Sequence, residues 1–209
     1  MRSSTPVPGN PWPHDMVITI EDDVHSLLDL LWIREARQLA TSGDDLPPHL
    51  SLSPVSEPVS DDEQRRVWSH AWPEVWRACL AHAGEERDPF VFDQLALTST
   101  EADERRELLA RLFGPSWQDS FGDAVFTEQY EEWNRGRFAE RTSPGAVQKS
   151  PEQLCLRDLV GAWQAGLTKI IEIPCRGTFT RRVGDHALLV TAPTREAPDA
   201  YAEALRSFA

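Results

Sequence analysis

The residues best suited to chemistry are Cys175 and Arg181, which have five residues between them. A cysteine thiolate attacks phosphate or acyl groups when a helix N-terminus and an arginine stabilise the surrounding negative charge. The apolar stretch 169–173 comes before Cys175, as a strand followed by a phosphate-binding loop requires. Residues 178–183, however, have the composition of a strand, where such a loop needs a helix. This context favours a cysteine in a turn beside strand arginines over a nucleophile.

A second arrangement pairs Cys175 with His186, with Asp185 or Glu172 to orient the imidazole. A nucleophile, a base and an orienting carboxylate are the groups that covalent catalysis needs. The competing interpretation is that His186 simply opens a strand. Cys175, Arg181 and His186 are therefore the candidate catalytic residues of an alternative hypothesis, in which the chain is a small cysteine-dependent enzyme acting on an anionic or acyl substrate.

Metal binding would depend on Cys79 and His82, which lie three positions apart, with His70 upstream. Zinc sites normally need a second closely spaced pair of ligands, and the sequence has no CxxC, HxxxH or HExxH motif. It also has no glycine-rich nucleotide loop and no GxSxG motif. We therefore expect no metal and no cofactor, and a buried thiol at Cys79.

Trp68, Trp72 and Trp76 recur every four residues and form an aromatic stripe on one face of an expected helix. Such a stripe could line a groove for a ligand or for a partner helix. Aromatic stripes at helical spacing are normally buried, which favours core packing. The sequence leaves both interpretations open.

The formal net charge of −13 argues against binding to nucleic acid or to an anionic membrane, both of which need clustered basic residues. Residues 169–195 are the exception, with five basic and two acidic side chains. Arg176, Arg182 and Arg195 are the candidate binding residues of this segment, for an anion or for an acidic partner. The alternative is that these arginines pair with the chain's own carboxylates.

The chain is expected to be a cytoplasmic protein. Its three cysteines are too few for a disulfide framework, the first residues lack the apolar region of a signal peptide, and no apolar run reaches the length of a membrane span. Residues 1–14 are expected to be a mobile tail and residues 15–209 a single domain. The Pro- and Ser-rich segment 43–60 is the place for a boundary if there are two domains.

Hydrophobic spacing predicts a mostly helical α+β fold with about six helices. Residues 169–173, 178–183 and 186–191 are expected to form a small antiparallel meander, with 16–20 as a further strand, before a C-terminal helix from about residue 198. Alternation along 178–183 should turn Arg181 toward the helices, where it needs a carboxylate or carbonyl partner, and Arg182 toward solvent.

These features favour a non-catalytic interaction protein over an enzyme. The acidic surface, the proline-rich segment and the lack of a strong catalytic motif fit an adaptor, an inhibitor or immunity-type partner, or a regulator. A protein partner is then expected, whereas nucleic acid and membrane are not. The cysteine-dependent enzyme described above is the alternative.

Overall fold

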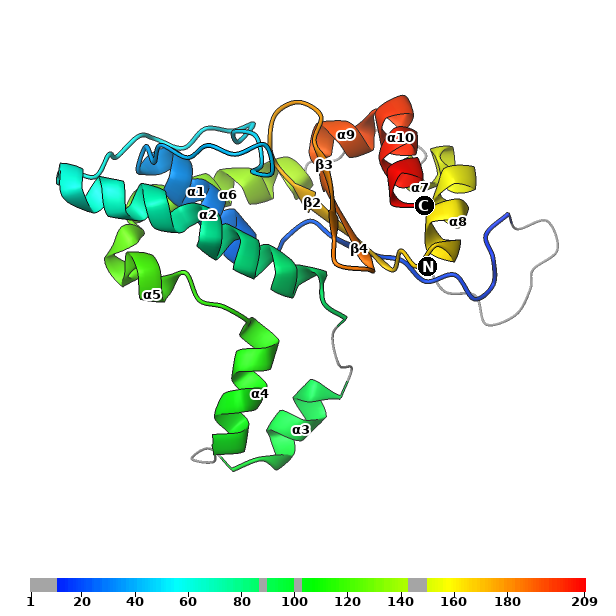
Figure 1. Ribbon diagram of the computed structural model, residues 1–209, viewed down its shortest axis with the longest axis horizontal. Coiled ribbons are helices and arrows are strands. Elements are labelled where there is room, and N and C mark those ends of the chain that lie inside the picture. The colour runs from blue at the N-terminus through cyan, green and yellow to red at the C-terminus, as the bar shows by residue number, and fades with distance from the viewer. Residues whose placement is uncertain (1–10, 87–89, 100–102, 143–149) are drawn as a thin grey trace.

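The computed structural model describes residues 11–86, 90–99, 103–142 and 150–209 and shows an α+β fold (Figure 1). Within these residues there are ten α-helices, more than the expected six or so, because short helices follow or divide the longer ones. In chain order the helices are α1 (His25–Ala36), α2 (Asp62–Gly84), α3 (Val91–Leu97), α4 (Asp103–Phe113), α5 (Gln118–Phe121), α6 (Glu128–Thr142), α7 (Pro151–Leu154), α8 (Leu156–Gln164), α9 (Ala192–Glu196) and α10 (Pro198–Phe208), with a 3-10 turn at Asp123–Val125.

The sheet is mixed, and the expected antiparallel meander is wrong. Its strands are β1 (Thr19–Glu21), β2 (Lys169–Ile173), β3 (Thr180–Val183) and β4 (Ala187–Thr191), in the order β1-β2-β4-β3. β1 and β4 both run parallel to β2, and only β3 and β4 pair antiparallel as a hairpin. The chain therefore crosses from β2 to the far side of β4 before it turns back.

Burial explains why β3 is not the central strand. Four of the five residues of β2 and all five of β4 are buried, whereas β3 buries only Val183. Strands covered by helices on both faces are apolar along their whole length. The strand that carries Arg181 and Arg182 is better placed at an edge, where charged side chains also discourage further pairing.

Helices cover both faces of the sheet (Figure 1). Ile171, Ile173 and Leu189 point to α1 and α2 and belong to the larger apolar core. The alternate residues, such as Ile170 and Leu188, point to α8 and α10 and belong to a second core. The period of two in the strands thus divides the apolar side chains between two layers of helices.

Capping residues set the starts of two helices. Asp61 accepts hydrogen bonds from the backbone N–H groups of Glu63 and Gln64 at the start of α2. Ser150 accepts from the N–H of Gln153, with Pro151 in the first turn, at the start of α7. Side-chain acceptors at these positions satisfy N–H groups that have no partner inside the helix.

The segment 43–60 lies against α1. Arg34, which is buried, donates to the carbonyl oxygens of Pro47 and Pro48 over 2.7 Å and 2.5 Å. Leu46 and Leu50 of this segment are buried in the larger core. Part of the expected N-terminal tail lies outside the described residues, but Trp12 packs against the second core. No helix in the described parts of the chain is long and apolar enough to cross a membrane.

Candidate functional site

Cys175 lies two residues after the end of β2 and is completely buried. Its backbone pairs with Leu50 in an isolated bridge. Burial raises the pKa of the Cys175 thiol to about 12, although the charge of Arg34 acts in the opposite direction. A catalytic cysteine must be accessible and largely deprotonated near neutral pH. The structure therefore gives no support to a nucleophilic role for Cys175.

His186 lies at the opposite end of the sheet from Cys175. It precedes β4, and its carbonyl accepts from the N–H groups of Thr168 and Lys169 at the start of β2. β2 and β4 run parallel, with Lys169 opposite Ala187, so the length of β2 separates His186 from Cys175. At about 3.3 Å per residue this is roughly 20 Å. The two side chains cannot form a nucleophile–base pair.

Arg181 has a carboxylate partner on the α2 side of the sheet. Its Nη1 donates to the backbone oxygen of Asp45 over 2.6 Å and to Oδ2 of Asp45 over 3.2 Å. Arg77 also donates to Asp45, and together the two arginines hold the pKa of this carboxyl at about 2. The expectation that Arg181 faces the helices and takes such a partner is confirmed.

The three arginines predicted to bind an anion all have partners within the chain. Arg195 bridges Glu152 and Glu172 at 2.8 Å and 2.7 Å. Arg176 donates to the Leu50 carbonyl and to Ser53. Arg182 is exposed, as expected, and its guanidinium lies over the Phe208 ring and donates to the Phe208 carbonyl. Binding of an anion or an acidic partner by Arg176, Arg182 and Arg195 therefore remains a prediction, and their contacts within the chain do not favour it.

Trp72 and Trp76 are core residues. Both are completely buried, and their rings stack with centroids 5.4 Å apart. The indole N–H of Trp72 donates to the Leu30 carbonyl of α1 over 2.7 Å. Trp68 is only partly buried and meets the edge of Phe121. The stripe thus joins α2 to α1 and does not line a groove.

Two features that the sequence did not predict lie near the C-terminal end of α2. The first is a projecting pair of helices, α3 and α4, which we call the arm (Figure 1). The arm has a small apolar core of its own, separate from the two main cores and made by Val91, Leu95 and Leu108 with Leu109 and Leu112. A hydrogen bond also links the two helices, since Arg105 of α4 donates to the Leu95 carbonyl of α3 over 2.6 Å.

The arm joins the body through a tight turn after α4. Gly114 has a φ of +70°, and a β-carbon there would lie 2.2 Å from the His82 ring. Only glycine fits such a position. The Cys79 thiol donates to the Pro115 carbonyl over 3.4 Å and fixes the same turn to α2.

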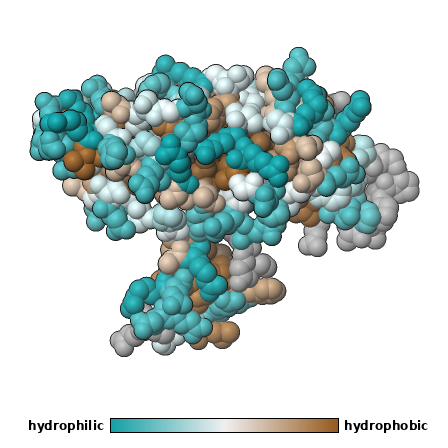
Figure 2. Space-filling view, in the orientation of Figure 1, coloured by the Kyte–Doolittle hydropathy of each residue, from teal (hydrophilic) through white to brown (hydrophobic). Residues whose placement is uncertain are grey.

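Large apolar side chains are exposed on the arm. Leu97 is 89% exposed, Phe113 70% and Phe92 66%. Figure 2 shows apolar side chains beside polar ones on the arm, which lies below the body. Single exposed apolar residues are normal on a protein surface, whereas contiguous apolar patches are typical of interaction sites.

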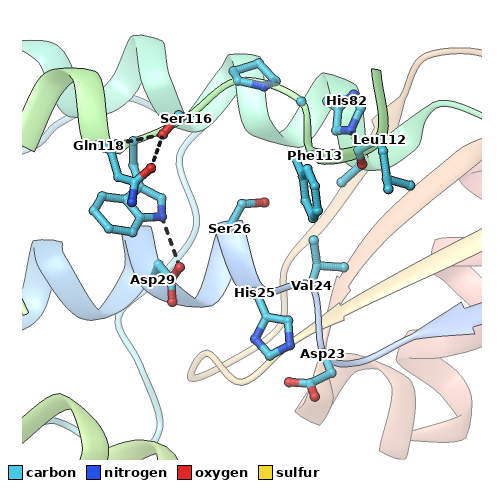
Figure 3. A pocket seen from close by; sticks show the side chains of 14 residues that line it. Asp23, Val24, His25, Ser26, Asp29, His82, Leu112, Phe113, Ser116 and Gln118 are labelled. Atoms are coloured by element: carbon cyan, nitrogen blue, oxygen red, sulfur yellow. Dashed lines mark hydrogen bonds between the residues drawn. The ribbon is translucent and has the colours of Figure 1, made fainter. Parts of the chain in front are cut away.

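The second feature is a pocket of about 550 Å³ at the foot of the arm, which we call the foot pocket (Figure 3). The first turns of α1, the end of α2 and the turn after α4 form its walls. Its lining side chains include His25, His82, Phe113 and Trp117. Figure 3 shows the Ser26 hydroxyl pointing toward the side of Phe113.

Asp29 connects the foot pocket to the core. Its two carboxylate oxygens accept from the Trp117 indole over 3.0 Å and from the Tyr130 hydroxyl over 2.5 Å. Burial raises the pKa of Asp29, and these two hydrogen bonds partly oppose that rise. Nearby, Asp23 pairs with the buried Arg137 at 2.6 Å. Both carboxylates that line the pocket therefore have partners within the chain.

Metal chemistry has no visible basis in the described residues, where no group of three or more His, Cys, Asp or Glu side chains is placed to hold an ion. His82 instead contacts the Leu112 carbonyl over 3.4 Å. Comparisons with family models, curated proteins and solved structures found no match to this chain. The function must therefore be argued from the arm and the foot pocket themselves.

Proposed function

We propose that this chain is a non-catalytic protein, an adaptor, inhibitor or regulator, that binds another protein through the arm. The observation that carries the proposal is the exposure of Phe92, Leu97 and Phe113 on an element that projects from the body and has its own small core. The cysteine-dependent alternative is not carried forward, because the thiol of Cys175 is buried and lies far from His186.

The energy available at this surface supports the proposal. Burying one Leu or Phe side chain contributes roughly 1.5–3 kcal/mol, so three of them offer roughly 4–9 kcal/mol before the entropy of association is subtracted. The helices of the arm have little stability of their own, since α3 and α4 are shorter than the ~12–15 residues at which isolated helices become even marginally stable. A partner that covers these side chains would therefore also stabilise the arm.

The positions of the exposed side chains suggest how the partner contacts the arm. Phe92 and Leu97 are five residues apart on α3, and at about 100° per residue they lie about 140° apart around the helix axis. They flank the buried stripe of Val91 and Leu95 on opposite sides. The arc of about 140° between them is the outer face of α3, turned away from this stripe, so a concave partner surface that lies on this face would contact both side chains.

Charge restricts the partner further. The exposed charges of the arm are mixed, with acidic Asp93, Asp103, Glu104 and Glu107 beside basic Arg106 and Arg111. The chain as a whole has a net charge of −13, which disfavours phosphate backbones and anionic lipids as partners. A concave surface with an apolar floor and a rim of both charges is complementary to the arm.

A matched pair of double variants tests the proposal. Phe92→Ser with Leu97→Ser removes apolar side chains from the arm, and Val55→Ser with Val67→Ser removes side chains that are 60% and 52% exposed elsewhere. Both should keep the melting temperature within about 2 °C of the wild type, since exposed substitutions change stability little.

Each tagged chain is used to capture partners from the native host. The wild type and the control variant should retain a stoichiometric protein partner, and the arm variant should retain at least about tenfold less, because about 1.4 kcal/mol of lost contact already has this effect. Equal capture by the arm and control variants, or no stoichiometric partner for the wild type, would contradict the proposal.

A further inference from the structure

We infer that the outer edge of β3 binds an extended acidic segment of a protein, which adds a strand to the sheet. Adding a strand to an exposed edge is a common way of recognising extended peptides, since the backbone supplies affinity and the side chains supply specificity. β3 is an outer strand of the sheet, with β4 as its neighbour. This edge is a different surface from the arm, so the inference goes beyond the proposed function and does not depend on it.

The hydrogen-bond register shows which backbone groups of β3 face outward. Thr191 of β4 donates its N–H to the carbonyl of Phe179, the residue before β3. In an antiparallel pair, hydrogen-bonded residues alternate with residues whose N–H and C=O groups point away from the neighbouring strand. Arg181 is therefore turned to β4, whereas the N–H and C=O groups of Thr180 and Arg182 point outward. Within the described residues no group hydrogen-bonds to these outward groups, so they can pair with a further strand.

The arginines of β3 select an acidic segment. Arg181, on the α2 face, shares the carboxylate of Asp45 with Arg77. Arg182, on the α10 face, is exposed, and in the described part of the chain it contacts the Phe208 ring and backbone carbonyls but no carboxylate. Consecutive side chains of an added strand point to opposite faces. Two neighbouring acidic residues would therefore meet Arg181 and Arg182, and opposite charges on adjacent strands stabilise their pairing.

The same charges argue against a second copy of the chain as the added strand. Two copies of β3 paired antiparallel would bring the arginines of one strand close to those of the other. Like charges directly opposite one another destabilise a pair of strands, and charged side chains protect an edge from self-association in this way. An acidic segment of another protein reverses the sign of this interaction, so charge determines which strand the edge accepts.

A groove of about 460 Å³ between β3 and α10 receives a further side chain of the added strand. Most of its lining side chains are small, namely Thr178, Thr180, Thr194, Ala200, Ala204 and Ser207. A side chain opposite Thr180 lies on the face of this groove, and a residue such as valine suits both the groove and the strand conformation. Glu203 also lines the groove, so its charge disfavours an acidic residue there. The expected segment therefore has two acidic residues flanked by β-branched ones.

The test uses the full-length chain and three peptides. They are acetyl-Thr-Val-Glu-Glu-Val-Thr-amide, a peptide with lysine in place of both glutamates, and a peptide with proline in place of both valines. Binding is followed by NMR through the backbone N–H resonances of Thr180 and Arg182. The acidic peptide should shift both resonances, and its affinity should fall as salt is raised. The lysine peptide should bind at least about tenfold more weakly because it meets like charges. The proline peptide should bind more weakly by a similar factor because it lacks N–H groups for the pairing.

Hydrogen exchange tests the register of the edge. In the free chain the backbone N–H groups of Arg181 and Val183, which face β4, should exchange more slowly than those of Thr180 and Arg182. With about 90% of the chain bound to the acidic peptide, exchange at Thr180 and Arg182 should slow by up to about tenfold, since only the unbound fraction stays open.

A matched pair of arginine variants locates the contact. Arg182→Gln removes a charge at the edge and should weaken binding of the acidic peptide about two- to fivefold, the effect of one exposed ion pair. Arg206→Gln changes the net charge equally but acts on α10, where Arg206 pairs with Asp158, and it should leave the affinity close to that of the wild type. The inference would be overturned if the acidic peptide did not bind, or if the lysine or proline peptide bound as tightly. Equal affinities of the two variants, or unchanged exchange at Thr180 and Arg182, would overturn it as well.

Discussion

Replacing Trp72 by alanine is expected to lower the free energy of unfolding by about 3–5 kcal/mol, the range for large aromatic side chains in cores. Trp72 is completely buried and stacks on Trp76. Its indole N–H also donates to the Leu30 carbonyl over 2.7 Å. Alanine would leave a cavity between α1 and α2 and remove that donor.

The size of the effect can be converted into a melting temperature. For a chain of about 200 residues, 1 kcal/mol corresponds to about 2–4 °C, so Trp72→Ala should melt about 6–20 °C below the wild type. Circular dichroism during heating, with urea denaturation as a second measurement, would record the loss. Trp68→Ala should cost less, because Trp68 is only partly buried.

Two further results test whether the Trp72 side chain is packed in the core. Trp72→Phe keeps an aromatic ring but loses the indole donor, and it should fall between the wild type and Trp72→Ala. A melting temperature for Trp72→Ala within about 2 °C of the wild type would show that the Trp72 side chain is not packed in the core. The tryptophan stripe would then have to be reconsidered as a binding groove.

In a variant without the other two cysteines, Cys175 should react with iodoacetamide at about pH 8 only as fast as the chain unfolds. The reason is that burial raises the pKa of its thiol to about 12. Rapid labelling of the folded chain would contradict this prediction. Arg181→Ala should lower the free energy of unfolding by about 1 kcal/mol through its lost bonds to Asp45, and thermal melts should show a smaller effect for the exposed Arg182→Ala. Burial raises the pKa of Asp29, so the folded chain keeps this proton to higher pH than the unfolded chain. The wild type should therefore lose stability relative to Asp29→Asn as the pH rises from about 4 through the raised pKa; parallel denaturation curves from about pH 4 to pH 8 would refute it.

Local signals in the sequence predicted local structure well. The tryptophan stripe predicted a helix face, because helical spacing acts within a few residues. The expected neighbouring strands 178–183 and 186–191 likewise predicted the antiparallel pair of β3 and β4. In each case the residues that determine the structure are close together in the chain.

The order of the strands depends on contacts that no short stretch of sequence contains. Nothing within 169–191 shows that β4 lies between β2 and β3, because that order follows from helices packing on both faces. The foot pocket was missed for the same reason, since its walls come from three separate segments. The helical period of α3 is hard to recognise in the sequence, because Phe92 and Leu97 are apolar but lie outside its buried stripe.

The pairing of β1 with β2 has a consequence for biosynthesis. Glu21 pairs with Ile171, 150 residues further along the chain, so the sheet is a structure of high contact order, which slows folding. At about 5–20 residues per second, a ribosome adds these residues in about 8–30 s. Throughout that time the strands β2 and β4, against which α1 and α2 pack, have not been synthesised, so apolar side chains of both helices stay exposed. We therefore expect the nascent chain to need a chaperone until β4 has been made.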